Sequence, residues 1–194
     1  MKTATLLMSI ATATSLAAGQ ELQSKPFHLV LQSANKSLHG LALSACHTGA
    51  AIESLCLYNK YGSIFHHNIT KGVQPGPGGL PGLLTWELPS QPPIPSSMTL
   101  NVDPSTNVAL PLFFPGNSNA QWLGFDKNNE MNIATYVDDT KSPPSGQRSR
   151  ALKNWHVCET YFAGYRYRTL AWVLGTGKPQ NPSCIKVQVK RKFV

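Results

Sequence analysis

The stretch WHVCETYFAGYRYRTLAWVLGTGKPQNPSCIKVQV, residues 155–189, decides the fold. It holds two runs rich in aromatic and β-branched residues, which favour strands, and a third run after a segment of Gly, Pro and Asn, which favour turns. Cys158 lies in the first run and Cys184 opens the last one. The pattern therefore predicts three strands tied by a Cys158–Cys184 disulfide.

The middle run of this stretch alternates in character along a strand. Arg166 and Arg168 share one face with Leu170 and Trp172, because successive side chains of a strand point to opposite faces. We expect Trp172 to lie in the core and the two arginines beyond its edge, with their stems packed. A stripe of aromatic and Arg side chains that binds a sugar or a phosphate is the alternative.

Short strand-like segments separated by Pro and Gly continue through the rest of the chain. Strands are predicted over residues 27–31, 38–45, 52–58, 64–70, 83–88, 98–102, 108–114, 122–125 and 131–137. Residues 72–95 outside the 83–88 strand, and residues 139–150, are predicted as loops. Pro111 predicts an edge strand because proline cannot donate to a ladder. Since no segment outside the N-terminus has helical periodicity, we expect an all-β, single-domain antiparallel sandwich of jelly-roll type.

The N-terminus resembles an export signal. Residues 1–19 combine one Lys, a short apolar run and small residues before the expected cleavage site, so residues 20–194 would form the secreted domain. A buried N-terminal helix is the alternative. Cleavage would lower the formal charge from +8 to +7. That charge favours anionic partners such as acidic polysaccharide, a membrane surface or nucleic acid, although it also serves solubility alone.

Export of the chain also predicts disulfides for the cysteines and glycosylation for two asparagines. Four cysteines in an exported chain predict two disulfides. Of the three pairings that four cysteines allow, closeness in sequence favours Cys46–Cys56 and Cys158–Cys184. Asn35 and Asn68 each begin an Asn-x-Ser/Thr triplet and are expected glycosylation sites.

No motif in the sequence defines a catalytic, metal or cofactor site. The segment closest to a serine-hydrolase elbow, residues 116–120, ends in Ala and precedes no helix. His66 and His67 are adjacent, so on a strand they face opposite ways and cannot share one ion. The segment Asp126–Glu130 lacks the Gly and the distal Glu of a calcium loop. We therefore predict no catalytic residue, metal or cofactor.

Five residues are the candidates for binding. A small basic ribonuclease would need His, Glu and Arg near one phosphate, and the chain supplies these residue types. The candidates are His47, His156, Glu159, Arg166 and Arg168.

Several short blocks of the sequence resemble one family. They are LHGLALSACHTGAA, STNVALPLFFPG, WHVCET, YRTLAWVLG and NPSCIKV, and the resemblance runs from Lys25 to Arg191. The chain is similar to a family of small secreted proteins from filamentous ascomycete fungi that is known only as a domain of unknown function. The resemblance implies a fungal extracellular protein and brings no catalytic residues with it.

Two hypotheses of function follow. In the first, the chain is a non-enzymatic extracellular protein, associated with the cell wall or acting as an effector, that binds a cell-wall glycan or a host protein. It predicts a polar groove with an exposed aromatic side chain and no converging acids. In the second, it is a small secreted hydrolase of RNA or polysaccharide, and two titratable groups such as His47 and Glu159 meet in a cleft. Neither a membrane span nor a nucleic-acid ligand is expected under the first hypothesis, and the oligomeric state is open.

Overall fold

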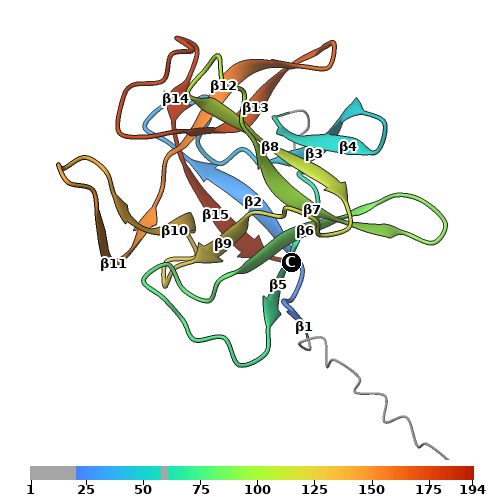
Figure 1. Cartoon of the computed structure of the whole chain (residues 1–194). Coiled ribbons are helices and arrows are strands. Elements are labelled where there is room, and N and C mark those ends of the chain that lie inside the picture. The colour runs from blue at the N-terminus through green and yellow to red at the C-terminus, as the bar shows by residue number, and fades with distance from the viewer. Residues whose placement is uncertain (1–20, 58–60) are drawn as a thin grey trace, which may run out of the picture.

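The computed structural model describes residues 21–57 and 61–194 (Figure 1). The expected signal peptide, residues 1–19, lies outside these residues. The described chain contains strands and no helix, as predicted. The strands are β1 (Glu21–Gln23), β2 (Phe27–Gln32), β3 (Ser44–Gly49), β4 (Ile52–Cys56), β5 (His66–Thr70), β6 (Gly82–Leu88), β7 (Ile94–Asn101), β8 (Val108–Pro115), β9 (Trp122–Phe125), β10 (Met131–Asp138), β11 (Ser145–Leu152), β12 (Trp155–Phe162), β13 (Tyr165–Val173), β14 (Ile185–Lys186) and β15 (Gln188–Phe193).

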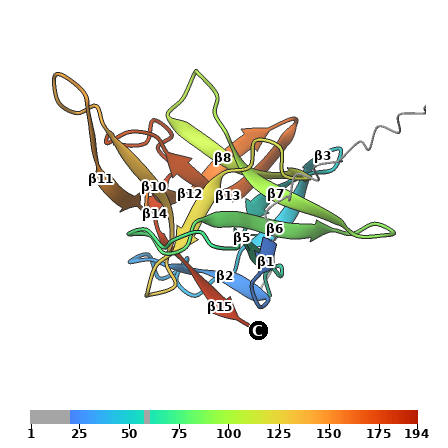
Figure 2. The same cartoon turned by 60° about the horizontal axis from the view of Figure 1, so that its bottom comes forward.

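The strands form one large sheet and one ribbon, and every strand pair is antiparallel. The main path of the 13-stranded sheet runs β11-β10-β9-β6-β7-β8-β4-β13-β12-β14, with β3 beside β4 and with β5 between β1 and β6. β2 and β15 form the two-stranded ribbon. These two strands run together across the middle of the molecule in Figure 1 and lie below the large sheet in Figure 2, which gives the sandwich-like layout. The β10–β11 hairpin projects from one side of the molecule in both views.

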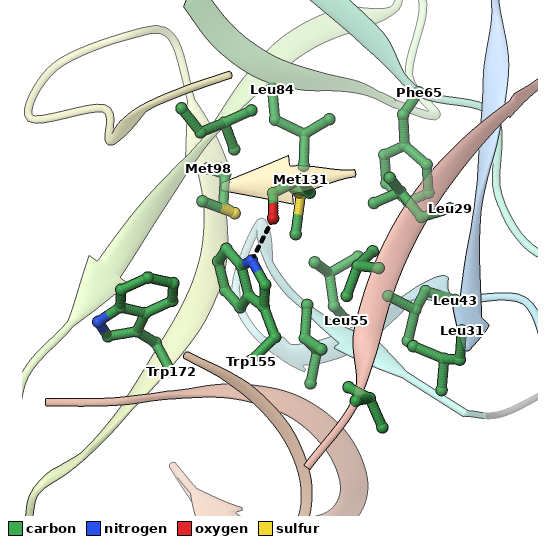
Figure 3. Close-up of a cluster of buried hydrophobic side chains, with 14 of the residues drawn as sticks. Leu29, Leu31, Leu43, Leu55, Phe65, Leu84, Met98, Met131, Trp155 and Trp172 are labelled. Atoms are coloured by element: carbon green, nitrogen blue, oxygen red, sulfur yellow. Dashed lines mark hydrogen bonds between the residues drawn. The ribbon is translucent and has the colours of Figure 1, made fainter. Parts of the chain in front are cut away.

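The core lies between the ribbon and the large sheet (Figure 3). Alternation along β2 explains the contribution of the ribbon, because Phe27, Leu29 and Leu31 are fully buried while the residues between them are half-exposed. On the sheet side Trp155 is fully buried and packs edge-on against Trp172, with 4.7 Å between ring centroids. The expected place of Trp172 in the core is confirmed.

Two disulfides hold the sheet, Cys46–Cys56 and Cys158–Cys184. These are the pairs that the sequence predicts. The first links β3 to β4, and the second links β12 to the segment that precedes β14. Cys158 packs in a second, smaller apolar cluster on the opposite face of the large sheet from Trp155. A covalent link therefore reinforces the side of the sheet with the smaller core.

The last predicted strand divides in two. Ile185 and Lys186 pair with β12, whereas the residues from Gln188 onward leave that strand and pair with β2. Val187 and Val189 stay buried through this change of partner. The C-terminal stretch therefore joins the large sheet to the ribbon that covers it.

Pro111 does not mark an edge strand. β8 lies inside the sheet, with β7 along one side and both β13 and β4 along the other. On that second side Ala109 faces β13 and Leu112 faces β4, so Pro111 lies where β8 changes partner. At this point the missing N–H of proline interrupts no ladder on that side.

The predicted loop over residues 139–150 is also wrong in part. Ser145 begins β11, which pairs with β10 through Arg150 and on to Leu152. The polar composition of this segment hid the strand, because β11 lies at the end of the sheet path with exposed side chains at Ser149 and Arg150. No helix among residues 21–57 and 61–194 is long and apolar enough to cross a membrane.

Candidate functional site

Three of the predicted binding residues meet at the tip of the β12–β13 hairpin. Glu159 lies directly opposite Arg168, and Arg166 lies opposite Tyr161. An ion pair joins Glu159 Oε1 to Arg168 Nε at 4.0 Å, with the two side chains 57% and 39% exposed. A pair this exposed contributes at most about 1 kcal/mol to stability. The arginines lie past the core edge, as expected from the alternation of the strand.

His47 has a different acidic partner from the one that a hydrolase was expected to use. Its Nδ1 lies 3.5 Å from Oε1 of Glu53, and its ring packs edge-on against Tyr165. Burial raises the pKa of the Glu53 carboxyl, against a hydrogen bond and a charge interaction with His47 that lower it. Within the described residues Glu159 is paired with Arg168, so the structure gives no pairing of His47 with Glu159.

His156 lies apart from both groups. It faces Lys186 across the β12–β14 pair, and its Nδ1 is 3.1 Å from the Asn154 carbonyl oxygen. Burial lowers the pKa of His156, the Asn154 hydrogen bond opposes this, and the charge of Lys186 adds to it. The five predicted residues are therefore distributed over three places in the fold.

A groove of about 700 Å³ lies beside the hairpin tip. Two carboxylates line it, Asp103 and Glu159, together with Tyr161 and Arg166. Hydrogen bonds from the hydroxyl and the amide of Ser105 lower the pKa of the exposed Asp103. A general acid in glycoside hydrolysis needs a raised pKa, so Asp103 does not have the property required of that acid.

A different pocket, of about 270 Å³, surrounds an exposed tryptophan that the sequence analysis did not single out. Trp122 is 48% exposed and lines this pocket at the start of β9. We call it the Trp122 pocket. Its lining combines an aromatic face, proline rings, amides and a hydroxyl, and no charged side chain among the described residues belongs to it. The side chains that supply these groups are Trp122, Pro77, Pro81, Gln74, Gln121 and Ser149.

The wall of the Trp122 pocket is a glycine-rich turn held by a buried amide. Gly76 and Gly79 exchange two backbone hydrogen bonds, and Gly79 adopts a positive φ of 91°. The buried Asn132 donates from Nδ2 to the carbonyls of Gly78 and Glu130, both at 3.1 Å. A Cβ at Gly78 would overlap Oδ1 of Asn132. Only glycine therefore allows the turn to sit this close, and the pocket wall is fixed by packing.

The sequence carried a signal for this pocket. Residues 72–95 contain the run PGPGG. Its many turn-forming residues predict a loop without regular structure. A glycine-rich turn also lets a backbone approach another group closely. Trp122 next to Gln121 at the start of a short strand was the second sign, because a Trp there has few covering residues.

The two expected glycosylation sites differ in setting. Asn35 lies in a turn, where its Oδ1 accepts hydrogen bonds from the amide and the hydroxyl of Ser37. Asn68 lies in β5 between β1 and β6, and its Oδ1 is buried without a hydrogen-bond partner. Among the described residues, no group of three or more His, Cys, Asp or Glu side chains is arranged to hold a metal ion.

The settings of Asn35 and Asn68 lead to a testable expectation about glycans. We expect secreted protein to lose mass on treatment with an N-glycosidase, and Asn35→Gln to remove most of that loss because the amide of Asn35 lies in an open turn. Asn68→Gln should change the mass less, because part of its amide is packed inside the sheet. Intact-mass spectrometry of the two variants checks this, and an unchanged mass for glycosidase-treated wild-type protein would refute both sites.

The fold and the pocket define a small all-β protein held together by two disulfides. The chain belongs to a family characterised by a domain of unknown function, DUF7907, whose model matches residues 24–193. This span is close to the one over which the sequence resembles its family. No curated protein and no solved structure matches the chain.

Proposed function

We propose that this chain is a secreted ascomycete protein that acts without catalysis, at the cell wall or as an effector, by binding a neutral glycan in the Trp122 pocket. The observation that supports this is an exposed indole beside amide and hydroxyl groups, in a pocket without charged side chains. Two disulfides are compatible with an oxidising, extracellular location. The nine acidic residues play no part in this pocket.

The chemistry of the Trp122 pocket suits a pyranose ring. One face of a pyranose presents C–H groups, which pack on the electron-rich face of an indole, while its hydroxyls need hydrogen-bond partners. Gln74, Gln121 and Ser149 offer such partners around the ring. Binding sites commonly combine an apolar wall with a few polar groups that fix orientation. The fixed glycine turn reduces the ordering cost of binding, which preserves affinity.

Trp122→Ala tests the proposal directly. We expect it to weaken binding to chitin or glucan by about tenfold, because loss of an aromatic stacking partner costs about 1–1.5 kcal/mol. The measurement is depletion of the soluble protein by insoluble polysaccharide, with a glycan array to find the preferred sugar. Tyr136→Ala is the matched control, since Tyr136 is 66% exposed and belongs to none of the pockets described here.

Three outcomes would decide this test. Binding lost in Trp122→Ala and kept in Tyr136→Ala supports the pocket. Equal binding by all three proteins would place the glycan elsewhere on the surface. Failure of the wild-type protein to bind any neutral glycan would leave a protein ligand as the remaining form of the binding hypothesis.

The alternative is a small hydrolase of RNA or polysaccharide, and one observation bears on it. Among the ion pairs of the described residues, His47–Glu53 is the one that couples an imidazole to a carboxylate. A hydrolase would use this pair as its acid and base. Hydrolysis of RNA or polysaccharide by the wild-type protein that disappears in His47→Ala would replace the binding proposal with this one.

A further inference from the structure

The β10–β11 hairpin separates two different surfaces. On one face Ala134 and Ser149 line the Trp122 pocket. Thr135 and Arg150 pair with each other, and each directly follows one of these pocket residues in the sequence. Their side chains therefore point to the opposite face of the hairpin. There they line a second groove, of about 710 Å³. The same two strands therefore line an uncharged pocket on one face and a separate groove on the other.

The second groove is basic, and we call it the basic groove. Arg150 enters it from β11, Lys178 from the segment after β13 and Lys186 from β14. Its lining contains one carboxylate, Asp139. Three cations against one anion leave a net positive charge at pH 7, and the side walls concentrate that field.

The three cations of the basic groove are not paired with acids. None of the ion pairs among the described residues includes Arg150, Lys178 or Lys186. Arg150 donates to the Val137 carbonyl at 3.3 Å, and Lys186 donates from Nζ to the Lys153 carbonyl at 2.6 Å. These bonds to neutral carbonyls orient the two side chains. The charges of Arg150 and Lys186 also interact with those of Asp138 and Glu130, but neither cation forms a direct ion pair with its acid.

Acids close to the groove are already engaged by other lysines. Lys153 lies 2.7 Å from Oδ2 of Asp126 and 2.8 Å from Oε2 of Glu130. Lys141 lies 3.9 Å from Oδ2 of Asp138. The three nearby carboxylates therefore form their direct ion pairs with Lys153 and Lys141, and within the basic groove three cations still outnumber the one carboxylate.

We propose that the basic groove binds an acidic polysaccharide through the carboxylate groups of its uronic acid units. Arg and Lys donate charge-assisted hydrogen bonds to carboxylates. Thr135, Thr140 and Thr176 also line the groove and offer hydroxyls to the sugar ring. This inference concerns a different face from the Trp122 pocket and does not depend on it.

Nucleic acid is the competing anionic ligand, and the lining of the groove disfavours it. Proteins that bind single strands offer aromatic side chains on which bases stack. Two aromatic rings are among the lining residues of the basic groove, and both are buried: Trp172 is 5% exposed and packed against Trp155, and His156 is 9% exposed. The groove therefore offers charge and hydroxyl groups without a surface for stacked bases.

The test measures binding of the full secreted protein to polygalacturonate and to its methyl ester, which has the same backbone without the charges. We expect binding to the acid form, little binding to the ester, and an affinity that falls as salt is raised. The triple variant Arg150→Gln, Lys178→Gln, Lys186→Gln should bind at least tenfold more weakly. These three side chains are exposed, so the variant should fold normally, which circular dichroism verifies.

Matched controls separate the groove from net charge. The variant Lys25→Gln, Lys36→Gln, Lys127→Gln removes the same charge from exposed positions outside the groove and should retain most of the affinity. Asp139→Asn removes the one acid and should strengthen binding about two- to threefold, an effect that misfolding cannot produce. The groove variant should keep its binding to chitin or glucan, so this inference and the proposed function fail or succeed separately.

Two results would overturn the assignment. An equal loss in the control variant would show that net charge alone attracts the polymer. Tighter binding to single-stranded RNA than to polygalacturonate, lost in the groove variant, would make nucleic acid the ligand of the basic groove.

Discussion

Trp155→Ala lowers the free energy of unfolding by about 4–5 kcal/mol, because a large buried side chain is replaced by a cavity. The whole stability of a domain is about 5–15 kcal/mol, so this single change brings the protein close to unfolding. The side chain of Trp155 is fully buried, and it belongs to the core cluster to which both the ribbon and the large sheet contribute. Its loss removes packing from both layers at once.

A hydrogen bond adds to the cost of this substitution. Trp155 Nε1 donates to the Met131 carbonyl at 2.9 Å, inside the core (Figure 3). Alanine would leave this buried carbonyl without its donor, at a cost of about 1–3 kcal/mol if no water enters. The bond also links β12 to β10, two strands that lie far apart along the sheet path. Trp155→Phe should therefore cost less than Ala, while still losing the hydrogen bond.

Denaturation by urea, followed by far-UV circular dichroism, measures this effect. Trp122→Ala is the control, because it removes the same side chain from a half-exposed position and should cost less than about 1 kcal/mol. Similar midpoints for the Trp155 and Trp122 variants would mean that the core does not depend on Trp155.

The alternation of side chains along the strands and the spacing of the cysteines predict much of the fold from the sequence. The alternation along β2 and β13 places each side chain on one face, so Leu29 and Trp172 are core residues by position alone. Which strands become neighbours depends on contacts between distant segments, and alternation does not encode this. The separation of β15 from β12, and its pairing with β2, therefore followed only from the structure.

The candidate site was less predictable than the fold, for a physical reason. A binding pocket is made by side chains from several distant segments, and the Trp122 pocket joins the turn around Gly78 to β9, β10 and β11. The predicted residues His47 and Glu159 are close to the same hairpin, but each has its own partner on its own strands. Residue type alone does not show which acid lies beside which base, because the chain contains nine acidic residues.

Acid destabilises this protein through His67. Its side chain is buried at 4% exposure in β5, beside the Phe125 ring and with Nε2 3.3 Å from the Leu123 carbonyl oxygen. Burial lowers the pKa of His67 to about 4; the hydrogen bond to Leu123 opposes this, and the charge of Arg191 adds to it. The folded protein therefore keeps this imidazole neutral at a pH where an unfolded chain would protonate it.

The direction of the pH effect follows from proton binding. Between pH 6.5, the ordinary value for His, and about pH 4, the unfolded chain binds one more proton at this site than the folded protein. Stability is therefore complete above pH 6.5, falls as the pH drops toward 4, and changes no further through this group below that. The shift corresponds to about 3 kcal/mol lost between pH 7 and pH 4.

Urea denaturation at pH 7, 5.5 and 4 measures this loss, and His67→Gln isolates the contribution of one group. Glutamine offers a donor to the Leu123 carbonyl and does not titrate, so the variant should lose about 3 kcal/mol less than the wild-type protein over this range. Other groups that titrate are present in both proteins and cancel in the comparison. His66→Gln, which removes an imidazole from the opposite, half-exposed side of β5, is the matched control variant. Parallel curves for wild type and His67→Gln would show that His67 is protonated equally in the folded and unfolded chain, and that its burial has no part in acid sensitivity.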